Sequence, residues 1–375
     1  MESTLIPAQE VFSAAQVERA RRYHRPIYVV RVLGIALSLI VLGALSFGGA
    51  GNALYGLVDS WSWWVAALAF PALIVVVQSL VHTPLAFWRY RHERHWGFST
   101  QTVGGWGADR LKGLAIAIVL TAVPLFLLIA TVHVFPGWWP VVAAAGAALF
   151  VLVVGFVAPL VLEPVFNRFE PLRDEALARE LRELSTRAGV PVREVLVADA
   201  SRRTKKHNAY VSGLGKTRRV VLWDTLLEGG DEGQVKLIVA HELGHRRYRH
   251  VALGTAIGMA SVGAFVVLLW LLFQWDALLE AIDASGPGDP RVLAFVLFLG
   301  TVLNLTFQPL VLALSRRWER ACDRFSLELT GDAATYERTH RRLALQNLGD
   351  LEPSRAAYLF FFSHPTPRER LAIAR

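Results

Sequence analysis

The chain has 375 residues, of which 54% are hydrophobic and only 19% are charged, a balance too apolar for an ordinary soluble protein of this length. Its formal net charge is +8, but the basic residues stand in short clusters beside long apolar runs, which is typical of membrane topology and argues against nucleic acid as a partner. The single cysteine, Cys322, excludes an intramolecular disulfide framework.

Six apolar segments are long enough to cross the roughly 30 Å hydrocarbon core of a membrane. Tryptophans stand at or near the ends of these segments, where their amphipathic rings favour the headgroup boundary. The sequence therefore predicts a multi-pass integral membrane protein. The segments cover about residues 30–50, 62–88, 113–134, 138–161, 251–275 and 291–314.

Loop charges predict the orientation of these segments. Lysine and arginine are frequent before the first segment, between the second and third, between the fourth and fifth, and after the sixth. Residues 51–60 and 135–137 contain neither, and residues 276–290 hold four acidic residues. The positive-inside rule then puts both termini in the cytoplasm. Because there are only five lysines against 34 arginines, we expect a GC-rich bacterial genome and therefore a bacterial plasma membrane.

The long insert after the fourth segment, about residues 165–250, is predicted to fold as an α+β unit. Short β-like runs at 195–198, 208–213 and 219–223 predict a small sheet. A later helix opens at Asp231, with Gln234 completing a capping box. An earlier helix is indicated by apolar residues at helical spacing, ended by a glycine and a proline: Leu177, Leu181, Leu184, Ala188, Gly189 and Pro191.

The later helix carries an HExxH motif, His241-Glu242-Leu243-Gly244-His245. Two histidines four residues apart project from one face of a helix and can bind one metal ion. The glutamate between them can act as a general base beside that metal. The basic residues that follow the motif are interpreted as topology anchors: Arg246, Arg247, Arg249 and His250.

A catalytic zinc also needs a third protein ligand and an open position for water. The fifth and sixth segments form a hairpin that returns the chain to the side of His245, so Glu319 is better placed than Cys322 to be that ligand. Asp323 lies four residues further on the same helical face and can accept the ring N–H of a ligand histidine. An acidic pair neutralised by neighbouring arginines explains this spacing equally well.

The run SRRWERACD at residues 315–323 resembles the S-R-x-x-E-x-x-A-D signature that follows HExxH in the integral-membrane CAAX prenyl proteases of the type 1 family and in the related HtpX-type proteases. Stretches at 90–113, 166–172, 207–227 and 363–371 also resemble that family. Since the likeness includes the N-terminal spans, it favours the prenyl-protease branch.

The resemblance implies a multi-span α-helical membrane protein with a cytoplasmic zincin-like α+β metallopeptidase domain. Residues 1–165 would form the N-terminal transmembrane region, with about four spans. Residues 166–375 would form the zinc metallopeptidase domain, interrupted by a transmembrane hairpin at about 251–314. The chain starts at what is the second span of the eukaryotic enzymes, which puts their closed seven-span chamber in doubt here.

Carried over residue by residue, the resemblance implies that one Zn²⁺ per chain is bound by His241, His245 and Glu319, as in gluzincins, with Glu242 as the catalytic base. Asp323 matches an aspartate that supports the ligands, although Cys322 beside it replaces the family's usual alanine. Two residues match side chains near the developing oxyanion, His364 and Arg370. The edge strand that holds the substrate backbone is matched by Asn208, Ala209, Tyr210, Val211 and Gly213.

The predicted function is that of a zinc-dependent membrane endopeptidase, cutting membrane-associated or misfolded proteins at the cytoplasmic membrane face. Cleavage of prenylated CAAX tails is the alternative, and it is less expected in a bacterium. A transporter or scaffold with a structural metal is the alternative of another class, against which the intact Glu242 speaks. The expected partners are a peptide or protein substrate and membrane lipid, while the oligomeric state does not follow from the sequence.

Overall fold

The structure, a computed structural model, describes residues 8–213 and 218–374. Within these residues, six helices are long and apolar enough to cross a membrane, which confirms the expected number of spans. They cover Ala14–Phe47, Trp63–His95, Val103–Val134, Trp139–Phe166, His250–Leu272 and Val292–Thr330. Since about 20 helical residues suffice to cross the hydrocarbon, the longer of these helices continue into the polar part of the molecule.

The helices are α1 (Ala8–Val11), α2 (Ala14–Phe47), α3 (Gly49–Tyr55), α4 (Trp63–His95), α5 (Val103–Val134), α6 (Trp139–Val157), α7 (Glu163–Phe166), α8 (Glu175–Arg187), α9 (Asp224–Gly229), α10 (Glu232–Arg247), α11 (His250–Leu272), α12 (Asp276–Ala281), α13 (Val292–Thr330), α14 (Ala333–Gln346), α15 (Arg355–Phe361) and α16 (Pro367–Leu371). The strands are β1 (Phe169–Pro171), β2 (Glu194–Ala198), β3 (Ala209–Ser212) and β4 (Arg219–Trp223). A π-helical turn, η1 (Ala158–Leu162), joins α6 to α7, and η2 (Ala200–Arg202) and η4 (Ala372–Ala374) are 3-10 turns.

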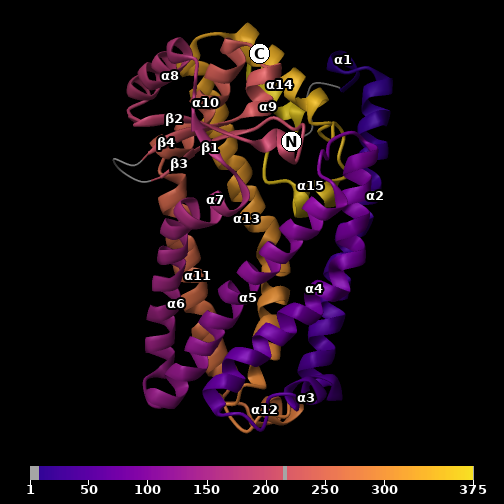
Figure 1. The fold of residues 1–375 in the computed structure, drawn as a ribbon, viewed down its shortest axis with the longest axis vertical. Coiled ribbons are helices and arrows are strands. Elements are labelled where there is room, and N and C mark those ends of the chain that lie inside the picture. The colour runs from indigo at the N-terminus through magenta and orange to yellow at the C-terminus, as the bar shows by residue number, and fades with distance from the viewer. Residues whose placement is uncertain (1–7, 214–217, 375) are drawn as a thin grey trace.

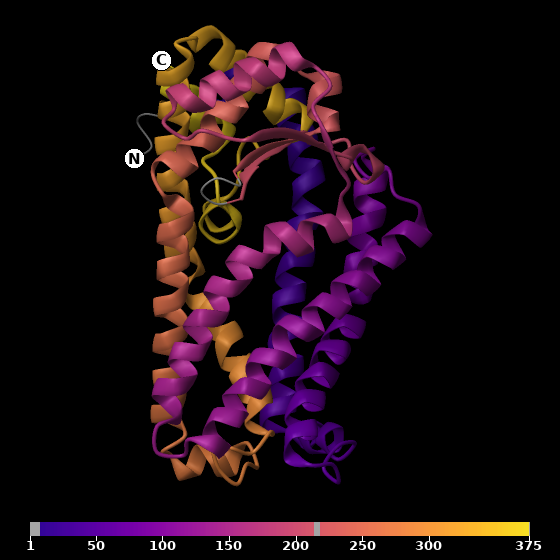
Figure 2. The same ribbon diagram turned by 60° about the vertical axis from the view of Figure 1, so that its left-hand side comes forward.

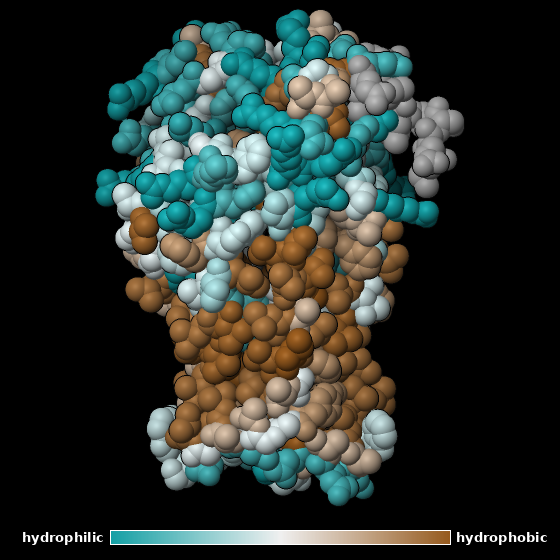
Figure 3. All heavy atoms as spheres, turned by 90° about the vertical axis from the view of Figure 1, so that its right-hand side faces the viewer, coloured by the Kyte–Doolittle hydropathy of each residue, from teal (hydrophilic) through white to brown (hydrophobic). Residues whose placement is uncertain are grey.

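The long helices run together along the molecule, and the α+β domain lies at one end of them (Figures 1 and 2). Figure 3 shows, on the face in view, a band of hydrophobic side chains over the helices, below the polar domain. Ile40, Leu80 and Leu310 on these helices are 66%, 67% and 66% exposed. Because contact with water would oppose so much apolar exposure, lipid is the expected neighbour of this band. Both ends of the described chain lie at the domain end, as an even number of spans requires (Figure 1).

The sheet has four strands in the order β1-β2-β4-β3. The central strands β2 and β4 pair in parallel, and each outer strand pairs antiparallel with its neighbour. Strand β3 therefore lies at an edge, although it is shorter than the predicted run and leaves Asn208 and Gly213 outside. Strand β1 was not predicted, because three residues that end in a proline carry no alternating pattern.

Helix α10 carries the HExxH motif, and its N-cap is Asp231, whose side chain accepts a hydrogen bond from Gln234 N at 2.8 Å. The predicted capping box is only half formed, since both polar atoms of the Gln234 side chain are buried without a hydrogen bond. Val235, Val239 and Leu243 pack into the core under the sheet and are at most 2% exposed. Helical positions two residues apart lie about 200° apart, so the motif histidines face away from this core.

Helix α13 connects the membrane-crossing part to the domain. Its 39 residues correspond to about 58 Å at 1.5 Å per residue, roughly twice the hydrocarbon thickness. The domain end of α13 packs against α10, and Gly244 of α10 lies close to Cys322 of α13. A Cβ atom on Gly244 would lie 3.2 Å from the Cα, Cβ and Sγ atoms of Cys322, tighter than nine in ten real Cβ contacts. The glycine of the motif therefore permits the close approach of α13.

Substituting Gly244 by alanine should separate α10 from α13 and weaken metal binding, because the acidic residues of α13 would move away from the motif. Overpacking of this kind costs about 1–3 kcal/mol in free energy of unfolding. Thermal unfolding in detergent and bound metal per chain measure the two effects. Gly263→Ala is the control, since a Cβ there meets nothing within 4 Å. Wild-type stability together with wild-type metal content in Gly244→Ala would show that the close approach is dispensable.

Polar contacts fasten the domain to the membrane helices. The Tyr23 hydroxyl of α2 donates to Glu93 of α4 at 2.7 Å, and Lys206 from the loop before β3 lies 3.3 Å from the same carboxylate. Arg203 pairs with Asp109 of α5 at 2.7 Å. These contacts tie three membrane helices to the segment that leads into β3, and so they fix the position of the edge strand.

The C-terminal helices α14, α15 and α16 were not predicted from the sequence. Each has an N-cap side chain that accepts a backbone hydrogen bond: Asp332 for α14, Ser354 for α15 and Thr366 for α16. Thr366 and Glu369 form a complete capping box, a pattern visible in the sequence TPRE that could have revealed α16. These helices matter because His340, His364 and Arg370 come from them or from the loop between them.

Candidate active site

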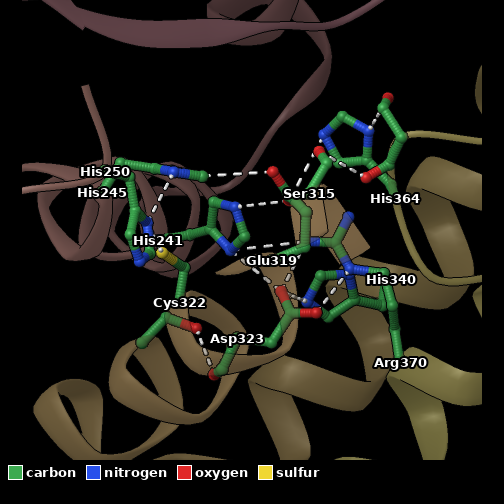
Figure 4. A network of polar contacts seen from close by, with 12 residues as sticks. His241, His245, His250, Ser315, Glu319, Cys322, Asp323, His340, His364 and Arg370 are labelled. Atoms are coloured by element: carbon green, nitrogen blue, oxygen red, sulfur yellow. Dashed lines mark hydrogen bonds and ion pairs between the residues drawn. The ribbon is translucent and has the colours of Figure 1, made fainter. Parts of the chain in front are cut away.

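Three side chains that could bind a metal lie close together: His241 and His245 of α10 and Glu319 of α13 (Figure 4). His241 Nε2 lies 3.1 Å from Glu319 Oε2, and His245 Nε2 lies 3.3 Å from Glu319 Oε1. The ligand atoms of the three residues all lie within 4.8 Å of one another. Bonds of about 2.0–2.1 Å to a tetrahedral zinc require ligand atoms about 3.3 Å apart, which these distances match.

The donor set also fits a metal by its hydrogen bonding. Glu319 is 5% exposed, and its Oε2 atom is buried without a hydrogen bond. Two ring nitrogens nevertheless approach this oxygen, His241 Nε2 at 3.1 Å and His364 Nε2 at 3.3 Å. A buried carboxylate oxygen left without a donor is costly in the absence of a cation. The described residues thus offer a site for a bound ion.

Asp323 lies fully buried behind the first histidine, one turn along α13 from Glu319. Its Oδ1 atom is 2.9 Å from His241 Nδ1, so it can accept the ring proton and leave Nε2 free for the metal. Arg370 Nε donates to Asp323 Oδ2 at 2.9 Å, and Arg370 Nη2 donates to Oδ1. Burial opposes the charge of Arg370, but the contact with Asp323 raises the pKa of its guanidinium above the ordinary value.

Asp323→Asn should lower the affinity for the metal by about 10–100-fold, because an amide no longer holds the ring proton of His241 so firmly. It would also leave Arg370 without its charged partner. Chelator competition on the purified protein measures the metal affinity. Glu328→Gln is the control, since it removes a carboxylate from an exposed position of the same helix. An unchanged affinity of Asp323→Asn for the metal would show that Asp323 does not support His241 as a ligand.

Glu242 faces a cavity of about 430 Å³ that also borders His241, His364 and Arg370. The pKa of its carboxyl is raised above the ordinary value because the side chain is shielded from water. A carboxylate with a raised pKa takes up a proton more readily, which suits a general base. The residue therefore has the position and the basicity to act on a water molecule in the cavity.

Helix α13 also holds the C-terminal segment that carries His364. Arg316 donates to the carbonyls of Tyr358 and Phe362 at 3.1 and 2.7 Å, and the Ser315 hydroxyl donates to Ser363 O at 2.8 Å. These bonds bring His364 to the cavity beside the three metal-binding groups, where Figure 4 shows it. The structure thus brings together all the predicted metal ligands and acid-base residues.

The edge strand is only partly joined to this cavity. Asn208, directly before β3, lines the cavity, whereas Ala209, Tyr210, Val211 and Gly213 are not among the described residues that line it. Arg246 of α10 donates to the carbonyl of Val211 at 2.6 Å. The guanidinium of Arg246 therefore binds the strand, a contact that its interpretation as a topology anchor did not include.

A family model described as Peptidase family M48 matches residues 171–375, more than half of the chain. The chain belongs to peptidase family M48. A second model, described as CAAX prenyl protease N-terminal, five membrane helices, matches residues 3–168. This M48 peptidase is thus a multi-pass integral membrane metalloendopeptidase, which acts on a peptide or protein substrate. The predicted family, fold class and type of activity are confirmed.

Relatives of this M48 peptidase include bacterial and eukaryotic proteins. It is 29% identical over 316 residues to Uncharacterized metalloprotease YhfN of Bacillus subtilis, covering 82% of this chain and 73% of that one. It is 28% identical over 331 residues to CAAX prenyl protease 1 of Saccharomyces cerevisiae, covering 81% and 71%. The crystal structure of S. mikatae Ste24p matches with a TM-score of 0.87 at 23% identity, covering 100% of this chain and 92% of that chain, which shows a shared fold.

Two histidines of the M48 peptidase adjoin the site although the sequence analysis assigned them no role in it. His340 of α14 is buried, its Nε2 atom lies 4.0 Å from Asp323 Oδ1, and burial lowers its pKa to about 3. His250 at the start of α11 has its Nδ1 atom 3.2 Å from His245 Nδ1. Its ring is buried and lies against His245, a contact that its interpretation as a topology anchor did not include. Proximity to HExxH was the available signal for His250, and no pattern pointed to His340.

Proposed function

We propose that this membrane metalloendopeptidase is a zinc enzyme of the gluzincin type, with one Zn²⁺ per chain held by His241, His245 and Glu319. The observation that carries this proposal is the convergence of Glu319 from α13 on the two HExxH histidines, with Oε2 left free of hydrogen bonds. When bound, zinc lowers the pKa of water towards about 7 and polarises a carbonyl oxygen.

Glu242 acts as the general base in this proposal. Its carboxylate takes a proton from the attacking water and later passes it to the leaving amine, two transfers that favour a group with a raised pKa. Its place in the cavity wall beside His241 supports this role.

His364 is the better placed of the two predicted oxyanion donors. Its Nδ1 atom lies 2.8 Å from the Ser363 hydroxyl, and a neutral ring that accepts from this hydroxyl carries its proton on Nε2. That nitrogen faces Glu319, so it can donate to an oxyanion formed beside the metal ligands. Two nitrogens of Arg370 are instead engaged by Asp323. Arg370 then acts by fixing Asp323, which in turn orients His241.

An extended substrate would pair with the free edge of β3, through the backbone of residues 208–213. Main-chain pairing gives affinity with little demand on sequence, which suits a broad specificity. Since Arg246 already donates to the carbonyl of Val211, a substrate N–H would share that oxygen with the guanidinium or displace it. Asn208 is the member of this group that also borders the cavity.

We place the site at the cytoplasmic face of a bacterial plasma membrane, since every loop on the domain side is basic. On this basis the substrates are membrane-associated or misfolded proteins. Cleavage of prenylated CAAX tails is the second candidate, favoured by the 28% identity to a protein named CAAX prenyl protease 1. We also propose a boundary near residue 165 between the membrane region and the peptidase domain.

The two substrate classes can be separated with purified protein in lipid vesicles. The substrates are a denatured soluble protein, a farnesylated CAAX peptide and the same peptide without the lipid. We expect cleavage of the denatured protein, with no preference for the lipidated peptide over its unlipidated form. Cleavage restricted to the farnesylated peptide would establish the second candidate. Zinc retained without any cleavage would instead support a structural metal in a transporter or scaffold.

A further inference from the structure

A second cluster of metal-binding atoms adjoins the first: His245, His250 and Cys322. His250 Nδ1 lies 3.2 Å from His245 Nδ1 and 3.6 Å from Cys322 Sγ. The three ligand atoms lie within 4.8 Å of one another. The three residues belong to α10, to the start of α11 and to α13. In Figure 4, His250 and Cys322 lie on the side of His245 away from Glu319.

The spacing of these atoms fits a tetrahedral ion with one thiolate ligand. Bonds of about 2.0–2.1 Å to nitrogen and about 2.3 Å to sulfur put two nitrogens about 3.3 Å apart and a nitrogen and a sulfur about 3.6 Å apart. The observed separations are 3.2 and 3.6 Å. A thiolate with two imidazoles is a soft ligand set, suited to zinc, cadmium or copper(I) rather than to magnesium or calcium.

The surrounding packing holds the cluster in place. The His250 ring stacks on Trp318 with centroids 4.8 Å apart and planes 8° apart, so its orientation is fixed. Cys322 is fully buried and lies against Gly244 of α10. The His245 side chain is 23% exposed and is the most accessible of the three, so an ion would enter beside it.

We propose that Cys322 Sγ, His250 Nδ1 and His245 Nδ1 form a second, inhibitory metal site for a thiophilic cation. His245 is shared, because its Nε2 atom faces Glu319 while its Nδ1 atom faces His250. Binding releases the thiol proton of Cys322 and, when Nε2 already holds an ion, the Nδ1 proton of His245, both to solvent. No electron transfer is involved. Loss of the Nδ1 proton changes the charge of a ring that the proposed peptidase site needs, and so the activity should fall.

Cadmium is the probe that tests this site on the zinc-loaded protein. We expect an ultraviolet charge-transfer absorption from a cadmium–thiolate bond, saturating at one cadmium per chain, with parallel loss of peptidase activity. Because Cys322 is the single cysteine of the chain, such an absorption reports on this position alone. Cys322→Ala should abolish the absorption and resist the inhibition while keeping its zinc and its activity.

The absorption is independent of the proposed function, since it requires no substrate. Absence of thiolate absorption in the wild-type protein would overturn the second site, whatever the peptidase does. Equal cadmium inhibition of the wild type and Cys322→Ala would show that cadmium acts only by replacing zinc. Should Cys322→Ala fail to fold, cadmium NMR of the wild type separates a thiolate ligand from nitrogen and oxygen ligands alone. His250→Gln should weaken the cadmium signal if the imidazole is a ligand.

Discussion

Glu242→Gln should lower kcat for cleavage of a denatured protein by about 10²–10⁴-fold, the usual contribution of a general base. The amide keeps the size of the side chain but cannot accept the proton of the attacking water. The metal content should stay at the wild-type level, because Glu242 is not one of the three converging ligand residues. Initial rates and bound zinc are measured on the same purified samples.

Glu232→Gln is the matched control, since it neutralises an exposed carboxylate on the same helix that is not among the described residues lining the cavity. It should cleave at the wild-type rate. If Glu242→Gln still cleaved at more than about a tenth of the wild-type rate, Glu242 would not be the general base, because the loss of rate would be smaller than the smallest loss expected for one. Loss of zinc from Glu242→Gln would instead reveal a structural contribution to the metal site.

Glu319→Gln should lower the affinity for zinc by more than about 100-fold, and cleavage should disappear with the metal. A residue that only supports a metal ligand contributes about 10–100-fold, so the loss of a direct carboxylate ligand should exceed that range. The carboxylate of Glu319 lies against both HExxH histidines, and an amide oxygen in its place would be a much weaker third ligand for the metal. Chelator competition measures the affinity.

Glu328→Gln, exposed nine residues along the same helix, separates the loss of a ligand from the loss of a charge on α13. It should bind zinc like the wild type. If Glu319→Gln also retained wild-type affinity, Glu319 would belong to an ordinary acidic pair neutralised by arginines. Cys322 would then have to be considered as the third ligand, and Cys322→Ala should lose the zinc.

Much of the membrane architecture could be predicted, because a membrane span needs only length and apolarity, and both are visible in one segment at a time. The domain was harder. The run at residues 219–223 indicated β4 correctly, whereas β1 has three residues and depends on pairing with β2 for its existence. Helices α14 and α16 are mostly polar, so their apolar faces become evident only once α10 packs on α14 and residues of α2 cluster with Ala344 and Leu371. Helix α15 is apolar but has only seven residues, and it depends on packing against α13.

Part of the candidate site could likewise be predicted from the sequence, and part depends on tertiary packing. His241 and His245 follow from local helical spacing, and Glu319 follows from the topology of a hairpin that returns to the same side of the membrane. His340 could not be recognised, because its place beside Asp323 arises from tertiary packing, whereas the sequence signal for His250 was its proximity to HExxH. Arg246 of α10 donates to Val211 of β3, a contact that the basic run after HExxH does not predict.

The most direct test of a zinc-dependent membrane endopeptidase is removal and return of zinc on the purified protein in lipid vesicles, with cleavage of a denatured protein as the readout. Cleavage should vanish when a chelator removes the zinc and return in full at one zinc per chain. The Glu242→Gln protein should rebind zinc to the same level without cleaving. Cleavage that persists after complete removal of zinc would contradict the account.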